Sequence, residues 1–286
     1  MIVPRTTRPE ILKKLTAKVA ARKPLLISSA GSGLVASLLE KAGADCVNTF
    51  SGARLRANGM GTMSMMWPIL DSNQQVYDNT TQDVLPAMKG DAFVCACINA
   101  NDPLRDMRSY LQSLLDAGIP SVSNIGPSVS YVDKGSNLYQ VLRKSGVTFE
   151  NEIEMLALAK EMGMVTIGLA FDLDDARQLL EGAKPDIFCF HAGTTKGGLV
   201  GFDSGETIAE TARRSEEAYQ MGRDIHPEVL LVGHGAAMET PEDAAYMLAN
   251  TSGHGIWTGS STERLPIEKA VFAAASEFAN LEFPNE

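Results

Sequence analysis

Two of the four histidines directly follow short apolar segments, where an imidazole could do acid–base chemistry. His191 follows the segment 187–190, and His234 lies between two glycines after the segment 229–232. An imidazole titrates close to neutral pH, so it can accept or donate a proton during a reaction. The alternative for each is a structural histidine that hydrogen-bonds a neighbouring loop. We take both as candidate catalytic residues.

Small residues, amides and hydroxyl groups follow other apolar segments and could hold an anion. Backbone N–H groups of glycine-rich turns and serine hydroxyl groups suit a carboxylate or a phosphate. An ordinary tight turn is the alternative for each glycine. The string 31–33 lacks the third glycine of a dinucleotide-binding fingerprint. The candidate substrate-binding residues of this kind are Ser29, Gly31, Ser51, Gly52, Asn99, Asn124, Thr194, Gly235, Ser260 and Ser261.

The apolar segments alternate with helical patterns along the whole chain. Strands that alternate with helices form parallel sheets with right-handed crossovers, and continuous apolar strands are typical of sheets buried on both faces. Strands are expected at 24–29, 45–50, 92–98, 121–123, 165–169, 186–190, 229–232 and 255–257. Helices are expected at 34–41, 74–88, 103–117, 136–145, 151–162, 174–181, 205–223, 241–249 and 266–279, and an extra helix at 7–20 precedes the first strand.

A closed (β/α)8 barrel, or TIM barrel, accounts for these α/β elements without leaving a strand edge open. A doubly wound open sheet is the alternative. The chain shows no linker or break in composition, so we predict one barrel domain over residues 1–286. Active sites of such barrels lie at the carboxyl ends of the strands. The candidate residues would then meet at one mouth of the barrel.

The composition excludes several classes of protein. Lys and Arg total 25 against 35 Asp and Glu, a net charge of −10, so no nucleic-acid partner is expected. The sequence has no uninterrupted apolar stretch of about 18 residues, so no membrane partner is expected. Four cysteines in 286 residues are too few for a disulfide framework, and no apolar leader follows Met1. We therefore expect a cytoplasmic protein.

Strings spread from about Arg8 to the C-terminus occur in an order and spacing typical of one family. They are Ser51-Gly52 with Arg54, Arg56, Gly59 and Gly61, then Asn73-Gln74, Asn101-Asp102-Pro103, Asn124, the string 152–155, the string 191–198, Gly233-His234-Gly235 and the string 259–266. Together they resemble the phosphoenolpyruvate hydrolase-like TIM-barrel family. That family is similar to the phosphoenolpyruvate/pyruvate-domain superfamily, which includes PEP mutase, phosphonopyruvate hydrolase and isocitrate lyase.

The resemblance implies an enzyme that cleaves or rearranges a bond next to a 2-oxo-acid carboxylate through an enolate. It implies that Ser51 and Gly52 bind a carboxylate or enolate oxygen, and it adds Glu152 as a candidate binding residue. It also draws attention to Asp71, since the string 71–73 looks like the Asp-Ser-Asn stretch of the mutases. The superfamily often uses Mg²⁺, which is a candidate cofactor here. However, the third strand ends in the string 97–99, Cys-Ile-Asn, where the superfamily has acidic ligands, so no cofactor is certain.

Our leading hypothesis is a lyase or hydrolase that cleaves a C–C, C–P or C–O bond of a small oxo-carboxylate or β-dicarbonyl substrate. His191 would move the proton, with Asp71 or His234 orienting it, while Arg54 or Arg56 would balance the charge of a small anionic substrate. The alternatives are a non-catalytic ligand-binding or regulatory barrel and a phosphate-binding barrel isomerase. The resemblance also implies a homo-oligomer, with contacts expected in the 60–66 loop and the final helix.

Overall fold

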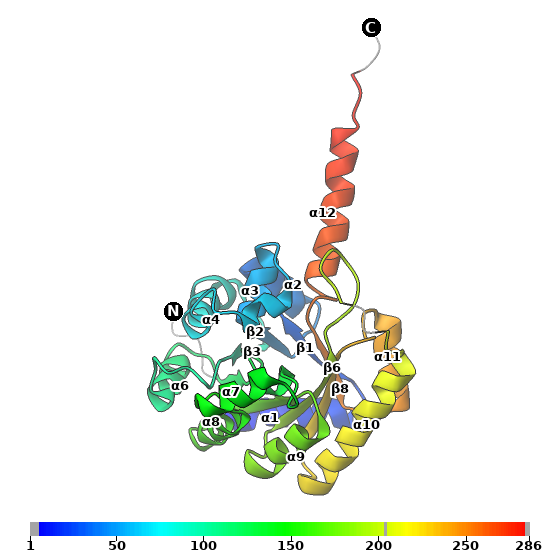
Figure 1. The fold of residues 1–286 in the computed structure, drawn as a ribbon. Coiled ribbons are helices and arrows are strands. Elements are labelled where there is room, and N and C mark those ends of the chain that lie inside the picture. The colour runs from blue at the N-terminus through cyan, green and yellow to red at the C-terminus, as the bar shows by residue number, and fades with distance from the viewer. Residues whose placement is uncertain (1–5, 203–204, 284–286) are drawn as a thin grey trace.

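The computed structural model describes residues 6–202 and 205–283, and its eight strands close into one parallel barrel (Figure 1). β1 pairs with β2 on one side and with β8 on the other, so the sheet closes on itself. This confirms the predicted TIM barrel and excludes the open sheet. The strands are β1 (Leu25–Ser29), β2 (Cys46–Thr49), β3 (Phe93–Cys97), β4 (Ser121–Ser123), β5 (Val165–Ala170), β6 (Ile187–Gly193), β7 (Leu230–Gly235) and β8 (Gly255–Thr258).

Helices follow the strands and surround most of the barrel (Figure 1). The predicted extra helix is α1, which starts with a reciprocal capping box between Thr7 and Glu10. Its Ile11 and Leu15 join the apolar cluster of the barrel interior. The helices are α1 (Arg8–Ala20), α2 (Gly33–Lys41), α3 (Ser51–Ala57), α4 (Ser72–Asp78), α5 (Leu85–Ala87), α6 (Met107–Asp116), α7 (Asn137–Lys144), α8 (Phe149–Glu161), α9 (Leu173–Gly182), α10 (Ile208–Ile225), α11 (Pro241–Asn250) and α12 (Arg264–Ala279).

Three elements differ from the sequence prediction. The helix expected at 74–88 is divided into α4, a π-helical turn η2 (Asn79–Val84) and α5. Thr80 and Thr81 bond to carbonyl groups four residues earlier, which competes with regular helix geometry. The helix expected from residue 103 begins at Met107, because the side chain of Asp106 caps it by accepting from the backbone N–H of Ser109. The stretch 51–57, expected as loop, is the short helix α3.

The barrel interior contains a cluster of buried apolar side chains. Ile27, Ile167 and Trp257 lie in this cluster with the four cysteines, which are all buried free thiols. In the described ranges, no helix is long and apolar enough to cross a membrane. The cytoplasmic location stays a prediction.

The final helix, α12, leaves the barrel instead of packing against it (Figure 1). Within it only Arg264 and Leu265 are buried, while Phe272 is 76% exposed. The helix after β8 therefore does not cover β8, and one domain over residues 1–286 stays a prediction.

Candidate active site

A small cavity lies at the carboxyl ends of the strands, where the barrel fold predicts an active site. Its free volume is about 40 Å³, which is room for only a few water molecules. Residues of β6, β7 and the loops after five strands line it. They are Phe50, Arg56, Thr62, Met63, Met65, Ile125, Tyr131, Phe171, His191, Thr194, Thr195, His234, Gly259 and Ser260.

The two candidate catalytic histidines are neighbours in this cavity. His191 on β6 is in register with His234 on β7. Their ring centres are 4.3 Å apart and the ring planes are nearly perpendicular, at 88°. The His191 ring also packs on the Phe171 ring, with centres 4.3 Å and planes 30° apart, and Phe171 contacts the Tyr131 ring at 4.8 Å. The His191 ring is therefore packed between other rings of the cavity.

Backbone groups give the two imidazoles opposite hydrogen-bonding roles. The backbone N–H of Gly193 donates to Nδ1 of His191 at 3.2 Å, so in a neutral ring the hydrogen is on Nε2. Nδ1 of His234 lies 2.6 Å from the carbonyl oxygen of Trp257, which can only accept, so there the hydrogen is on Nδ1. The cavity is thus lined by one ring with an Nε2–H donor and one ring with a bare Nε2.

The surroundings keep both rings neutral. Burial, together with the neighbouring His234, lowers the pKa of His191 well below its ordinary value. Burial also lowers the pKa of His234 to about 4, although its bond to the Trp257 carbonyl favours the charged form. Neutral imidazoles at pH 7 can act as bases or as uncharged hydrogen-bond donors.

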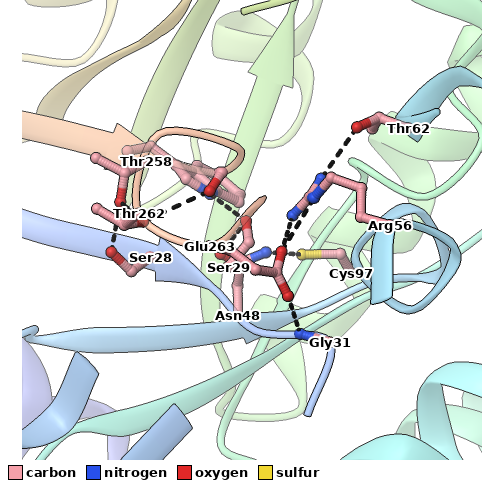
Figure 2. Close-up of polar contacts among 12 residues, drawn as sticks. Ser28, Ser29, Gly31, Asn48, Arg56, Thr62, Cys97, Thr258, Thr262 and Glu263 are labelled. Atoms are coloured by element: carbon pink, nitrogen blue, oxygen red, sulfur yellow. Dashed lines mark hydrogen bonds and ion pairs between the residues drawn. The ribbon is translucent and has the colours of Figure 1, made fainter. Parts of the chain in front are cut away.

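A buried ion pair forms one wall of the site (Figure 2). Nε of Arg56 donates to Oε2 of Glu263 at 3.0 Å, Nη2 bonds the same oxygen, and the two side chains are 2% and 4% exposed. The other carboxylate oxygen of Glu263 accepts from the backbone N–H of Gly31 at 2.5 Å. Nη1 of Arg56 donates to Thr62 at 3.1 Å. Arg56 therefore lines the cavity with its charge already neutralised.

Among the predicted binding residues, Arg56, Thr194 and Ser260 line the cavity with the two histidines. Thr194 shares a hydrogen bond of 3.1 Å with the hydroxyl of Tyr131. Ser261 follows Ser260 in the same turn but is not among the lining residues.

Two predicted glycines have structural reasons to be glycine. A Cβ on Gly235 would lie 1.9 Å from the carbonyl oxygen of Gly193, and φ at Gly235 is +84°. A Cβ on Gly31 would lie 2.4 Å from the carbonyl oxygen of Ala53. Because Glu263 already occupies the N–H of Gly31, that group is not free for a substrate anion in this structure.

The serine and asparagine side chains at the ends of β1, β2 and β3 are engaged by neighbouring protein groups. Ser29 donates to Oδ1 of Asn48 at 3.0 Å, and Nδ2 of Asn48 points to the sulfur of Cys97 at 3.5 Å (Figure 2). Asn99 uses its side-chain oxygen to accept from the backbone of Asn101. Neither Ser29 nor Asn99 lines the cavity.

Helix α3 places Ser51, Gly52 and Arg54 behind the cavity wall. Ser51 is fully buried and accepts from the hydroxyl of Ser72 at 3.1 Å. A Cβ on Gly52 would lie 2.4 Å from the Phe50 ring, so this glycine permits close packing. Arg54 is half-exposed and faces Asp83 at 3.4 Å. None of the three lines the cavity.

The structure gives Asp71 a different partner from the predicted one. Its side chain caps α4 at Gln74 and forms an ion pair of 2.8 Å with Arg105. His191 is instead fixed by Gly193 and Phe171. Asp71 therefore does not orient His191 here, because α4 and Arg105 engage its carboxylate.

Glu152 and Asn124 form a buried pair that anchors the loop after β4. Asn124 donates to Glu152 at 2.7 Å, and Ser128 and the backbone N–H of Val129 also donate to this carboxylate. Burial raises the pKa of Glu152 to about 8, against these bonds. Neither residue lines the cavity.

Sequence reasoning missed several lining residues and the partner of Arg56. Glu263 lies in the string 259–266, which carried the family resemblance, so the sequence did contain a signal that could have identified Glu263. Thr195 likewise lies in the string 191–198, whereas Tyr131 and Phe171 belong to none of these strings. Only the folded loops bring them to the cavity.

The residues at this mouth do not fit Mg²⁺. This cation is held by oxygen ligands that usually include carboxylates. Within residues 6–202 and 205–283, no group of three His, Cys, Asp or Glu side chains is placed to hold a metal ion. The carboxylates of Glu263 and Glu152 are engaged by Arg56 and Asn124. The donor set therefore disagrees with the cofactor that the resemblance implied.

Comparison with known sequences finds a family and longer relatives. The sequence profile of the family described as phosphoenolpyruvate hydrolase-like matches residues 10–281. The ToMV resistance protein Tm-1(GCR237) of Solanum lycopersicum is 33% identical over 275 residues, which are 96% of this chain and 36% of the tomato protein. The putative transcriptional regulatory protein y4pA of Sinorhizobium fredii is 26% identical, over 97% of this chain and 45% of that protein. The chain thus spans less than half the length of these relatives.

Comparison with solved structures finds similar barrels. Phosphoenolpyruvate phosphomutase from Streptomyces platensis subsp. rosaceus is 16% identical with a TM-score of 0.60, covering 94% of this chain and 88% of that one. Phosphonopyruvate hydrolase in complex with oxalate and Mg²⁺ is 16% identical with a TM-score of 0.59, covering 96% and 88%. At these identities the likeness establishes the fold.

Proposed function

Because the chain belongs to the phosphoenolpyruvate hydrolase-like family, we propose that it is an enzyme that breaks a bond next to a carbonyl group. The reaction is a lyase or hydrolase cleavage of a C–C bond, or of a C–P or C–O bond, through an enolate. The observation that carries this proposal is the pair of neutral histidines in the cavity at the barrel mouth. The names of the phosphomutase and the phosphonopyruvate hydrolase with similar barrels support the same reaction class.

The substrate is a small oxo-carboxylate or β-dicarbonyl compound whose carbonyl oxygen gains negative charge during the reaction. The N–H of His191 and the hydroxyl groups of Thr195 and Ser260 are among the lining groups that can hydrogen-bond this oxygen. A preorganised donor of this kind lowers a barrier by about 3 kcal/mol. Since the free volume is only about 40 Å³, we expect the turn η1 (Thr62–Met66) and the loop at 194–195 to move when substrate enters.

Thermal unfolding with pyruvate, acetoacetate and inorganic phosphate tests this function. A ligand at about 100 times its dissociation constant should stabilise the fold by about 2.7 kcal/mol. We expect a carbonyl compound to raise the unfolding temperature of the wild type but not of His191→Leu. The variant His226→Leu is the control, since His226 lies before β7, at the opposite end of the barrel. Stabilisation by phosphate alone would favour a phosphate-binding isomerase, and stabilisation by no compound would favour a non-catalytic barrel.

We also propose that the chain works as a homo-oligomer in which α12 packs on a second copy. Its exposed apolar side chains include Val271 and Phe272, and in a barrel of this kind the helix after β8 would cover β8. The neighbouring helix α2 exposes Leu34 and Leu38, one turn apart, which suit such a helix.

Light scattering tests this arrangement, since the monomer mass is 30.7 kDa. We expect the wild type to have a multiple of this mass and Val271→Glu to be a monomer. Lys269→Glu, at an exposed polar position of the same helix, should leave the mass unchanged. A monomeric wild type would contradict the proposal.

A further inference from the structure

The described residues that line the cavity lack the charged groups that a divalent cation or a doubly charged substrate would need. Building on the function proposed above, we propose that the site works without a metal ion and takes a carbonyl compound with at most one negative charge. In this reaction the Nε2–H of His191 bonds the carbonyl oxygen and the bare Nε2 of His234 removes a proton from the adjacent carbon. These two nitrogens replace the Lewis acid and the base of a metal-assisted site.

The charge of the lining residues carries the first half of this inference. Among the described residues that line the cavity, Arg56 alone has a formal charge, and Glu263 neutralises it. Phe50, Met65 and Ile125 contribute apolar surface. A dianion would lose its hydration here without meeting an uncompensated cation, which is costly in a buried site. A neutral or singly charged carbonyl compound avoids most of this cost.

The second half of the inference, the division of the two rings into donor and base, rests on the position of the hydrogen in each ring. Gly193 and the Trp257 carbonyl set opposite tautomers, and neither bond uses Nε2 of its ring. No hydrogen bond among the described residues involves Nε2 of His191 or Nε2 of His234. One hydrogen-bond donor and one proton acceptor therefore lie on adjacent strands, with ring centres 4.3 Å apart.

The proton transfer balances without a further reactant. His234 takes the proton from the carbon next to the carbonyl and becomes an imidazolium. The electron pair of the C–H bond forms the new C=C bond, and the π pair of the C=O bond moves to the oxygen, which becomes an enolate oxygen held by the N–H of His191. Return of the proton from His234 to the carbon restores the neutral ring. If the proton returned is a deuteron from solvent, the substrate is labelled.

Solvent deuterium exchange, followed by proton NMR, tests the inference. The full chain is stripped of metal with a chelator and mixed with acetoacetamide, acetoacetate or oxaloacetate, which carry no charge, one negative charge and two negative charges. The exchange rate of each compound is compared with its rate without protein, in the presence and absence of added Mg²⁺.

We expect the protein to accelerate the exchange of acetoacetamide or acetoacetate without metal, and to accelerate the exchange of oxaloacetate least. Exchange that needs Mg²⁺, or that is fastest for oxaloacetate, would overturn the inference while leaving the proposed function intact. No acceleration under any condition would also overturn the inference, whereas the proposed function is tested separately by stabilisation of the fold by a carbonyl compound.

Variants separate the two roles. The amide nitrogen of an asparagine replaces Nδ1 of a histidine, and that of a glutamine replaces Nε2. His234→Asn keeps a donor for the Trp257 carbonyl but lacks the base, so we expect exchange to fall by at least about 100-fold. His191→Gln keeps an N–H near Nε2 and should lose about tenfold, whereas His191→Leu should lose about 100-fold. Binding of acetoacetamide, measured by thermal unfolding, should survive in His234→Asn and show that this variant is folded. If His234→Asn retains exchange, His234 is not the base.

Discussion

Replacing Glu263 with alanine should destabilise the fold by about 3–5 kcal/mol, because it leaves a buried guanidinium without its counter-ion. Arg56 is 2% exposed and bonds to Glu263 through two of its nitrogens. The same change leaves the backbone N–H of Gly31 without its acceptor. In a domain of this size, the unfolding temperature should fall on the order of 10 °C. Urea unfolding and calorimetry measure both quantities.

The exposed pair Arg143–Glu150 is a matched control for this prediction. Its geometry is also close, with an N–O distance of 2.7 Å, but its side chains are 40% and 45% exposed. Glu150→Ala should therefore cost less than about 1 kcal/mol. The double variant Arg56→Leu/Glu263→Leu should recover part of the loss, since it buries no unpaired charge. A cost for Glu263→Ala no larger than that for Glu150→Ala would show that the buried pair is not required.

Acidification should destabilise the wild type through His234, by at most about 3 kcal/mol between pH 7 and pH 4. The unfolded chain binds a proton at this residue below about pH 6.5, whereas the folded protein binds it only near pH 4. The free energy of unfolding therefore decreases as the pH falls through this window. The lowered pKa of His191 acts in the same direction.

Comparison with His234→Asn isolates this effect from other titrating groups. The raised pKa of Glu152 acts in the opposite direction, since its folded form favours the proton up to about pH 8. Both proteins contain Glu152, so the difference between their unfolding free energies removes its contribution. We expect the wild type to lose more stability than His234→Asn on going from pH 7 to pH 4. Equal losses would mean that the ring of His234 is not held neutral.

The barrel could be predicted because its signal is local and repeated. Each strand is a short apolar segment, and each helix has its own pattern and cap, such as Thr7 with Glu10 in α1. That α12 extends away from the barrel could not be predicted in this way. Its sequence predicts a helix at 266–279 correctly, but the surface against which it packs is a matter of tertiary structure.

Of the site, the sequence could predict only that it lies at the strand ends and that it contains the two histidines. His191, His234, Arg56, Thr194 and Ser260 reach the cavity because barrel closure brings the strand ends together. The partners that decide their chemistry are remote in sequence. Glu263 lies 207 residues from Arg56, and the Trp257 carbonyl lies 23 residues from His234. For the same reason Asp71, chosen by resemblance to a short string, bonds to Arg105 and not to His191.

Nitrogen-15 NMR of the imidazole rings most directly tests the central claim, that the barrel mouth holds two neutral histidines of opposite tautomers. The chain has four histidines, so substitution of each in turn assigns their signals. At pH 7 we predict hydrogen on Nδ1 and a bare Nε2 in His234, and the reverse in His191. A charged ring at either position, or the same tautomer at both, would contradict the claim and with it the division of the two rings into donor and base.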